Sequence, residues 1–518
     1  MNTRQRWATK SGLILALAGN AIGLGNFLRF PVQAAQNGGG AFMIPYFVAL
    51  VLIGLPMMWV ECAIGRLGGK HGHGHTAGML ALLWHHPAAK YIGALGIFIP
   101  FTVALYYSYI TSWCLAFSVF AFTGRYDGLT TREAMESFLS AFQGVAANEH
   151  FASVATAYTF YVVTLAIMLL VLAGGVAKGI ERLAKVAMPL LFVFGALIVI
   201  RVLLLGTPDA SAPERNVMNG LGFVWNPNLS RLGDPKVWVA AAGQIFFTLA
   251  IGWGIIHTYV SYLEENDDIV LTGMCTAGLN ELAEVIIGGT IALTAAVAFF
   301  GVTATEDIAR GGAFDLGFAA MPMVFQKLPL GNVIGAFWFL LLFFAGLTSA
   351  VAMGQPLIAL LQENWAMTRG RAVAILGAAM FVLTQPVIFY QRFGFLDELD
   401  FWVGAIGLAV FGVLEMIVFA WIFGMERGWA EILRGAAVRP PALFKRVIQY
   451  VTPAYLLGIL GWWAVTDMPD RLVLRGASPE ARPYLIFGRI MTIVILVTTA
   501  ALVRHASRTW SLDEKRHS

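Results

Sequence analysis

The chain has 518 residues, of which 58% are hydrophobic and only 12% are charged, and its formal net charge is +4. Ordinary soluble domains carry about 25% charged residues, so this composition indicates a membrane protein with many spans. The modest charge, with Lys and Arg spread over short loops, argues against nucleic-acid binding.

Apolar stretches long enough to cross a membrane, which takes roughly 20 residues in a helix, occur about twelve times. The first has no small-residue cleavage site, so we expect no cleavable signal. The predicted spans are residues 9–35, 40–66, 88–122, 155–173, 183–205, 237–262, 270–300, 331–362, 371–389, 400–424, 446–466 and 484–504.

Basic residues in the short loops fall on one side of these spans, which predicts that this side and both termini are cytoplasmic. One loop on the same side is acidic, at residues 264–268. The longer segments 123–154, 206–236 and 301–330 are then outside. We expect a multi-pass protein of the cytoplasmic membrane.

The first predicted span contains an unusual stretch at residues 18–31, AGNAIGLGNFLRFP. Its three glycines weaken a helix, and Asn20 and Asn26 are polar at membrane depth. Non-helical backbone persists in a membrane only where it lines a cavity or is buried in protein. Gly19 and Gly23 also have the spacing of a helix-packing motif, but packing leaves the two asparagines unexplained. The stretch therefore predicts a binding site.

A second break lies in the sixth span at residues 247–254, FTLAIGWG. Glycine-interrupted spans five apart indicate two inverted repeats of five helices with the site between them. We expect a transport core at residues 1–430, with repeats at about 9–205 and 237–424. The remaining segment, 431–518, holds two more spans, which we expect to serve packing or a homodimer contact.

Polar side chains in other apolar spans extend this prediction. The hydroxyls of Thr348 and Ser349 either bond back to their own helix or, if they face the first break, offer oxygens to Na⁺. Glu61 and Glu284 are functional candidates at membrane depth, with a protonated structural carboxyl as the alternative. Glu61 in that role would brace an unwound loop.

Several charged residues and histidines near the predicted membrane surfaces have both a functional and a non-functional interpretation. Arg29 and Asp400 on the outer side, and Arg4 and Glu363 on the inner side, are either gates or ordinary surface residues. Three histidines in a glycine-rich loop favour a solvated loop over a metal site, because no carboxylate partner is evident. These are His71, His73 and His75.

Four segments resemble the neurotransmitter:sodium symporter family, most closely its bacterial amino-acid members such as the leucine transporter. They are WATKSGLILALAGNAIGLGNFLRFPVQAAQNGGGAFMIPY, GQIFFTL, LNELAEVI and FFAGLTSAVAMGQP. The resemblance covers nearly the whole chain and weakens in 123–154 and past residue 430. It implies an all-α membrane protein of about twelve helices, with two five-helix inverted repeats and unwound first and sixth helices.

The resemblance also implies site residues. It places a first sodium ion on Ala21, Asn26, Thr248 and Asn280, and a second on Gly19, Ile22, Ala345, Thr348 and Ser349. It places the amino-acid substrate against Ala21, Leu24, Gly25, Val103, Tyr107, Phe247, Thr248, Ala250, Trp253, Ser349 and Met353. The implied gates are Arg29 with Asp400 and Tyr107 with Phe247 outside, and Arg4 with Glu363, near Tyr262 and Trp7, inside.

Departures from the family pattern refine the expected substrate and ions. Trp253 adds bulk to the pocket, which favours small neutral amino acids such as glycine or alanine. Met353 is flexible and keeps leucine or methionine as the alternative. Glu284 lies where chloride-dependent members have a serine, which predicts a chloride-independent transporter and suggests proton counter-transport.

The sequence thus predicts a sodium-coupled symporter for neutral amino acids that uses one or two Na⁺ ions at two sites. A sensor on the same fold, which binds an amino acid without transporting it, is the competing interpretation. We expect no enzymatic activity, because no nucleotide-binding loop, hydrolase motif or activated nucleophile is evident.

Overall fold

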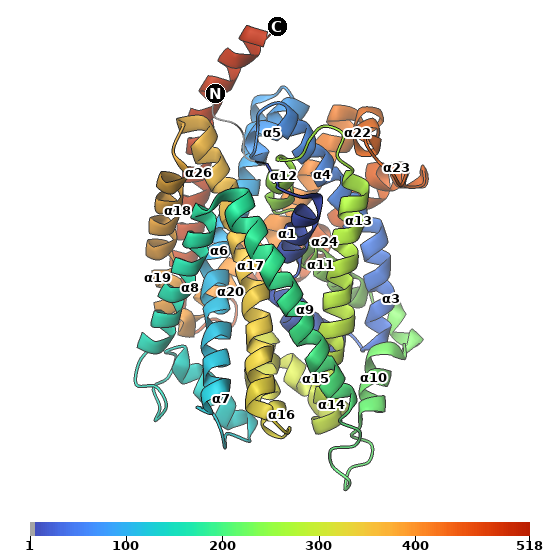
Figure 1. Cartoon of the computed structure of the whole chain (residues 1–518), viewed down its shortest axis with the longest axis vertical. Helices are drawn as coiled ribbons and strands as arrows, with labels where there is room; N and C mark the ends of the chain where they lie inside the picture. Colours follow the sequence, from blue (N-terminus) through green and yellow to red (C-terminus); the bar gives the residue numbers. More distant parts are fainter. Residues whose placement is uncertain (1–5, 518) are drawn as a thin grey trace.

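The computed structural model describes residues 6–517, apart from the side chains of residues 509 and 511–517. Helices and their connections account for this whole part of the chain, with no strand in it. The all-helical prediction is therefore confirmed. Both termini lie at the same end of an elongated helix bundle (Figure 1).

The first part of the bundle comprises the helices up to residue 310. Its helices are α1 (Lys10–Ala21), α2 (Phe30–Gln36), α3 (Gly40–Ala49), α4 (Leu55–Lys70), α5 (Thr76–Leu83), α6 (Pro87–Thr123), α7 (Arg132–Phe142), α8 (Ala155–Ala173), α9 (Arg182–Leu203), α10 (Val217–Trp225), α11 (Pro235–Thr248), α12 (Ile255–Val260), α13 (Ile269–Glu281), α14 (Ala295–Phe300) and α15 (Val302–Arg310).

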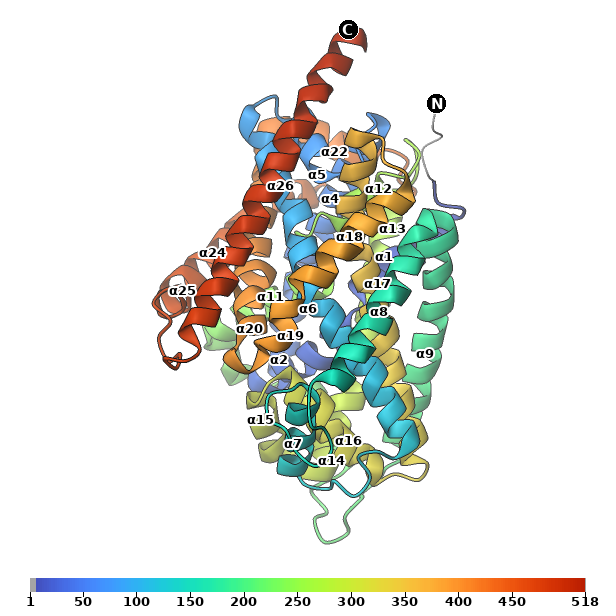
Figure 2. The ribbon, with the colours of Figure 1, turned by 90° about the vertical axis from the view of Figure 1, so that its left-hand side faces the viewer.

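The second part completes the bundle and adds an outer layer. Its helices are α16 (Met321–Gln326), α17 (Gly331–Trp365), α18 (Arg369–Leu383), α19 (Gln385–Phe389), α20 (Phe395–Leu399), α21 (Leu408–Ile417), α22 (Met425–Leu433), α23 (Leu443–Arg446), α24 (Thr452–Thr466), α25 (Met468–Leu472) and α26 (Arg482–His517). Helices α24, α25 and α26 lie together on one flank (Figure 2).

Nine helices in the described part of the chain are long and apolar enough to cross a membrane. The number rises to ten if Lys10–Ala21 and Gly25–Gln36, which meet at a bend of 47°, form one span. The two other predicted spans are residues 237–262, which fall mainly on the short helices α11 and α12, and residues 446–466, which include α24. The total of twelve spans therefore stays a prediction.

The core is built around the two longest inner helices, α6 and α17, which pack against each other. Helix α6 begins with Pro87, whose fixed φ suits a first turn, and ends at Gly124 in the left-handed region, φ 68°. Helix α1 packs against α9, α13 and α17. This arrangement brings the first break in the chain against the middle of α17.

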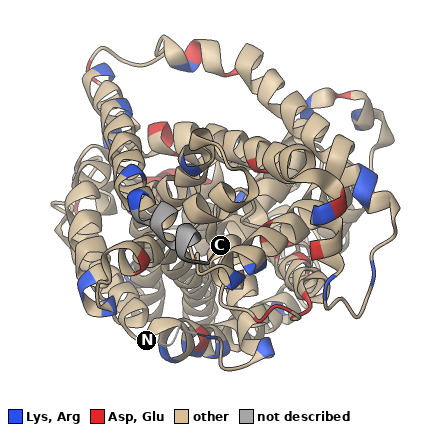
Figure 3. Cartoon of the chain, turned by 90° about the horizontal axis from the view of Figure 1, so that it is seen from above, with Lys and Arg blue, Asp and Glu red and all other residues tan. Residues whose placement is uncertain are grey.

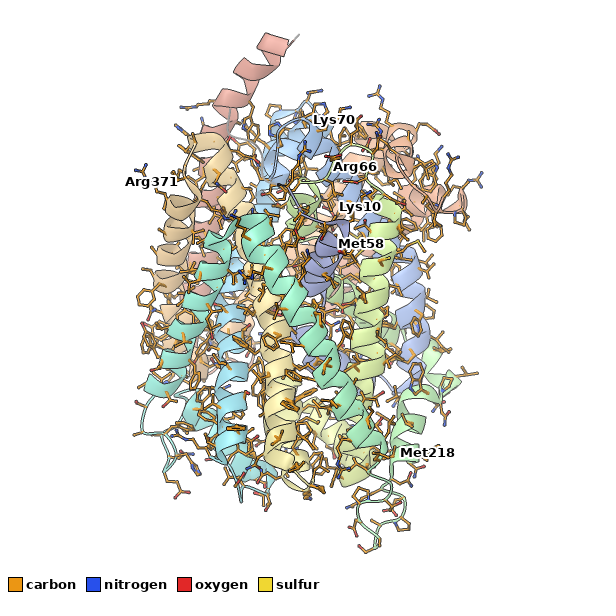
Figure 4. The ribbon with its side chains drawn as sticks, in the orientation of Figure 1. Lys10, Met58, Arg66, Lys70, Met218 and Arg371 are labelled. Atoms are coloured by element: carbon orange, nitrogen blue, oxygen red, sulfur yellow. The ribbon has the colours of Figure 1, made fainter. Side chains whose placement is uncertain are left out.

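Lys, Arg, Asp and Glu residues are spread over the elements at the end that carries the termini (Figure 3). Lys10, Arg66 and Lys70 lie near this end, and Met218 lies at the opposite end (Figure 4). The acidic loop at 264–268 is paired with basic neighbours, including Lys70 on Glu265 at 2.6 Å. This hydrogen bond lowers the pKa of the Glu265 carboxyl. The acidic exception in the charge pattern is therefore neutralised locally.

Candidate functional site

The first break follows directly from the end of α1. The helix stops at Ala21, and Ile22 has ψ 90°, which turns its carbonyl out of the helical pattern. Freed backbone donors find side-chain partners: the Gly23 N–H donates to Asn26 Oδ1 at 2.8 Å, and the Leu24 N–H donates to the Tyr107 hydroxyl at 2.9 Å. Helical backbone resumes as a π-helical turn at Gly25–Arg29. The break is thus held by polar side chains, as backbone at membrane depth requires.

The second break spans residues 249–254, between α11 and α12. Gly252 and Gly254 have φ values of 77° and 74°, and Ala250 has 50°, so the chain uses left-handed backbone at three positions. The Gly252 N–H donates to Glu61 Oε1 at 2.6 Å. The expectation that Glu61 braces an unwound loop is therefore confirmed.

A buried polar cluster joins the two breaks. Asn26 Nδ2 lies 3.1 Å from Thr248 Oγ1, 2.8 Å from Asn280 Oδ1 and 3.0 Å from Glu284 Oε2. Thr248 also hydrogen bonds to Glu284, whose other oxygen accepts from Gln244 Nε2 at 2.7 Å. Three of the four residues predicted for the first sodium ion thus meet in one place. Gln244, one turn before Thr248, was not predicted, although it is a polar residue in an apolar span.

A second cluster lies where α1 contacts α17. The Ser349 hydroxyl is within hydrogen-bond distance of the carbonyls of Gly19 (3.3 Å), Asn20 (3.0 Å) and Ala345 (3.1 Å). Thr348 Oγ1 donates to its own helix at Ala345 and Phe344. The structure therefore brings together four of the five residues predicted for the second sodium ion, Gly19, Ala345, Thr348 and Ser349, and the fifth, Ile22, follows Gly19 by three positions in the chain. The alternative of hydroxyls bonding back to their own helix also occurs here.

A small cavity of about 20 Å³ lies beside the first break. That is close to the volume that holds one water molecule, so an amino-acid side chain enters only if the lining moves. Phe247 and Trp253 form an edge-to-face pair over it, with ring centroids 5.9 Å apart. The lining residues are Asn20, Ala21, Gly23, Gly25, Asn26, Tyr107, Phe247, Ala250, Trp253, Ser349 and Met353.

Most of the predicted substrate residues line this cavity, and three do not. Leu24 lines a larger cavity above it, and Thr248 belongs to the polar cluster. Val103 is fully buried one turn before Tyr107 on α6 and lines neither cavity.

The larger cavity has a volume of about 480 Å³, and its lining includes residues 311–314, which follow α15, a helix at the end away from the termini (Figure 1). Arg29 and Asp400 both line it. The Arg29 guanidinium lies over the Phe247 ring at 4.5 Å, and Asp400 accepts from the Tyr106 hydroxyl at 2.6 Å. Among the described residues, the Arg29 guanidinium and the Asp400 carboxylate form no ion pair within 4 Å. The two residues predicted as the outer gate therefore line one cavity without contacting each other. Tyr106 was not predicted.

On the side of the termini, Trp7 packs against the end of α12. Trp7 Nε1 donates to the Tyr259 carbonyl at 2.9 Å, and their rings make an edge contact at 5.4 Å. Tyr262 accepts from Gln355 Nε2 at 2.7 Å. Arg4, the predicted partner of Glu363, lies outside the described residues.

Glu363 instead contacts the histidine loop. Its carboxylate accepts from the Gly74 N–H at 2.9 Å and lies 3.5 Å from His75 Nε2. The ligand atoms of His73, His75 and Glu363 all lie within 4.8 Å of one another. The expectation that these histidines lack a carboxylate partner is therefore wrong, because the end of α17 reaches their loop.

Comparisons with known proteins agree with this geometry. The family model of the sodium:neurotransmitter symporter family matches residues 4–161 and 129–508. An uncharacterized sodium-dependent transporter of Methanocaldococcus jannaschii, MJ1319, is 29% identical over 510 residues, covering 96% of this chain and 97% of its own length. YhdH of Bacillus subtilis, also described as an uncharacterized sodium-dependent transporter, is 30% identical over 383 residues, covering 74% and 78%.

Among solved structures, that of MhsT in complex with L-phenylalanine is similar, with a TM-score of 0.75 and 28% sequence identity. The match covers 88% of this chain and 99% of that one. The whole-chain family match and this structural likeness lead to one conclusion: the chain belongs to the sodium:neurotransmitter symporter family.

Proposed function

We propose that the protein is a sodium-coupled symporter that imports neutral amino acids by alternating access. The observation that carries the proposal is the cluster of Asn26, Thr248 and Asn280, which joins both breaks directly beside a cavity. Amide and hydroxyl oxygens are the ligands that a small hard cation prefers. The relatives described as sodium-dependent transporters support the choice of Na⁺.

The two clusters correspond to two sodium sites. The first combines the Ala21 carbonyl with Asn26, Thr248 and Asn280, and the substrate carboxylate completes it. The second combines carbonyls of α1 with the hydroxyls of Thr348 and Ser349. Sodium binding then orders both breaks, and each ion that enters through 100 mV releases about 2.3 kcal/mol to drive accumulation.

The substrate is proposed to be a small neutral amino acid. Its carboxylate would meet the Leu24 N–H and the Tyr107 hydroxyl, which now bond to each other. Trp253 is 2% exposed and lines a cavity of about 20 Å³, which favours glycine or alanine. Met353 lines the same cavity and can yield space, so leucine or methionine is the alternative. The bound L-phenylalanine of MhsT also favours this larger class.

Glu284 is proposed to make transport independent of chloride. Its carboxylate is fully buried and bonded to Asn26 and Thr248, beside the first sodium site. A fixed negative charge there takes the place of an anion. On this proposal, protonation of Glu284 in the return step would accompany proton counter-transport.

The proposed topology places both termini in the cytoplasm, because Lys10, Arg66 and Lys70 lie near the end that carries them (Figure 4). Residues 1–430 form the transport core of two five-helix repeats, and 431–518 form an added layer. That layer lies on one flank (Figure 2), which suits packing or a homodimer contact.

Uptake into proteoliposomes tests the proposal. Glycine, alanine, leucine, methionine and tryptophan are offered with an inward sodium gradient, and again with potassium in place of sodium. Sodium-dependent uptake of glycine or alanine supports the symporter with a narrow pocket. Uptake of leucine or methionine keeps the mechanism and removes the argument from Trp253.

The second candidate function is an amino-acid sensor on the same fold. It is favoured by the small volume of the cavity, about 20 Å³, because a ligand enters or leaves it only if the lining moves. Sodium-dependent binding without accumulation in the vesicles would select it over the symporter.

A further inference from the structure

Three ionisable side chains meet beside the second break. Glu61 on α4, His257 on α12 and Glu415 on α21 are each 0% exposed. His257 Nδ1 lies 3.3 Å from Glu61 Oε2, and His257 Nε2 lies 3.4 Å from Glu415 Oε2. Each nitrogen of one imidazole therefore faces a different carboxylate. We call these three residues the Glu–His–Glu triad.

The net charge of the triad favours the binding of protons. A neutral imidazole has one N–H donor and one acceptor, and an ionised carboxylate only accepts. Neither ring nitrogen of His257 forms a hydrogen bond in this state, so the two contacts are electrostatic, and a proton added to the imidazole or to a carboxylate makes them favourable. Without added protons the triad holds two negative charges out of water, which is strongly unfavourable. One proton leaves a single negative charge, and two protons make the triad neutral.

Neighbouring charges do not replace these protons. Among the described residues, no Lys or Arg forms an ion pair within 4 Å of either triad carboxylate, and His257 is the only basic side chain that does. Arg66 on α4 pairs with Glu431 at 2.9 Å, and Lys10 on α1 pairs with Asp267 at 3.1 Å. The other titratable groups on α4, on α12 and on α17, which packs against α12, are Cys62, Lys70, Tyr259 and Glu363.

We propose that the Glu–His–Glu triad is a proton-binding site whose occupancy changes as the transporter changes conformation. The site is separate from Glu284, which belongs to the polar cluster between the breaks. The inference rests on the proposed function, because it uses the movement of one group of helices against another.

The packing shows which contact such a movement breaks. On Gly65 of α4 a Cβ atom would lie 2.5 Å from the His257 carbonyl, and on Gly69 one would lie 2.2 Å from the Ser261 carbonyl. Helices α4 and α12 are thus in backbone contact and move as one body. Glu415 lies on α21, in the tenth predicted span. In the alternating access that we propose, the bundle of spans one, two, six and seven rocks against the rest, so Glu415 lies outside the moving group. Rocking therefore separates His257 from Glu415 and preserves its contact with Glu61.

Proton binding is then linked to conformation. In the described state the imidazole lies between the two carboxylates. When Glu415 moves away, the two carboxylates separate, and a proton bound in the triad no longer offsets the charge of both. By linkage, protons stabilise the described state and slow the switch to the opposite one.

The pH dependence of uptake tests this inference with matched variants. The amino acid selected by the uptake screen is measured with a fixed sodium gradient from about pH 6 to 8, where histidine titrates. We expect the wild-type rate to fall by about fivefold or more at the acidic end, the low end of typical coupling. His257→Gln and Glu415→Gln should flatten this profile. His71→Gln, which alters an exposed histidine on the loop after α4, should keep it.

A wild-type profile retained in both His257→Gln and Glu415→Gln would overturn the proposal. If one of the two variants fails to fold, the other decides. If Glu284→Gln alone flattens the profile, the fall in uptake at acidic pH is due to the polar cluster and the triad is not the proton site.

A measurement without transport keeps the inference distinct from the proposed function. The chain has nine histidines, so ¹⁵N-histidine NMR of the full protein in nanodiscs, compared with His257→Gln, assigns the His257 signal. We expect its protonation to change between sodium-containing and sodium-free samples at one pH. A His257 signal that is identical in both samples would overturn the proton site even if transport is confirmed, whereas a shift with no transported amino acid would remove only the symporter.

Discussion

Asn26 is the residue whose removal tests the first sodium site most severely. Its side chain is 0% exposed, and its amide contacts Thr248, Asn280 and Glu284 through two N–H donors. Its oxygen accepts from the Gly23 N–H at 2.8 Å. Asn26→Ala removes all of these contacts and leaves a buried N–H and a buried carboxylate short of partners.

The size of the effect follows from those contacts. A net hydrogen bond contributes about 1 kcal/mol, and a buried group left without a partner costs about 1–3 kcal/mol. We therefore expect Asn26→Ala to weaken sodium binding by about 2–4 kcal/mol, which is about 30- to 1,000-fold in affinity. Because the substrate carboxylate is proposed to share that ion, substrate affinity should fall together with sodium affinity.

The assay is equilibrium binding of the transported amino acid to purified protein over a range of sodium concentrations. The matched control is Asn37→Ala, which removes an asparagine whose Nδ2 bonds to the Gln33 carbonyl at 2.8 Å, outside both clusters. The control should bind like the wild type. Unchanged sodium and substrate affinities in a folded Asn26→Ala protein would refute the first-site assignment.

Three further changes have directions that the structure sets. Glu284→Ser removes the buried carboxylate beside the first cluster, so uptake should become dependent on chloride when chloride is exchanged for gluconate; unchanged uptake in both salts would contradict this. Trp253→Phe removes bulk from the pocket and should shift competition in the uptake assay towards leucine and methionine, whereas an unchanged preference would show that Trp253 does not set size. Arg66→Ala leaves Glu431 buried with only Arg434, at 3.5 Å, as a cationic partner, and removes the donor to the carbonyls of Asp267 and Arg434, so thermal unfolding in detergent should shift downward by the equivalent of about 3 kcal/mol, the low end for a broken buried pair. Arg6→Ala, which breaks an exposed pair with Glu264, should shift it little.

The sequence was most informative where local chemistry contradicts a membrane helix. Glycines and asparagines at residues 18–31 predicted the first break, and the break indeed ends α1 at Ala21. Polar residues within apolar spans, such as Asn280 and Ser349, predicted side chains that the structure brings to the breaks. Each such residue can be recognised from the sequence alone, because burying a polar group without a partner is costly.

Contacts between distant spans could not be predicted in this way. His257 and Glu415 are 158 positions apart, and neither helix alone shows that their side chains meet. The contact of Glu363 with the histidine loop likewise depends on where α17 ends. A lone glutamate in the apolar stretch 408–420 was the available signal for Glu415, but its partner required the packing of three helices.

The shape of the cavities also depends on packing. Residue types predicted most of the side chains that line the small cavity. Val103 and Thr248 were also predicted for the substrate site, but neither lines this cavity. Arg29 and Asp400 were predicted as a pair and line one cavity without touching. Distances of this kind depend on the conformational state, which no residue pattern specifies.

Coupled flux is the most direct test of the central claim, that sodium and an amino acid cross the membrane together through this site. Proteoliposomes containing the wild-type protein are given ²²Na⁺ and the labelled amino acid selected by the screen, each with and without the other. The account predicts that the amino acid accelerates sodium entry and that removing sodium abolishes amino-acid entry. Amino-acid entry at the same rate without sodium, or sodium entry indifferent to the amino acid, would contradict it.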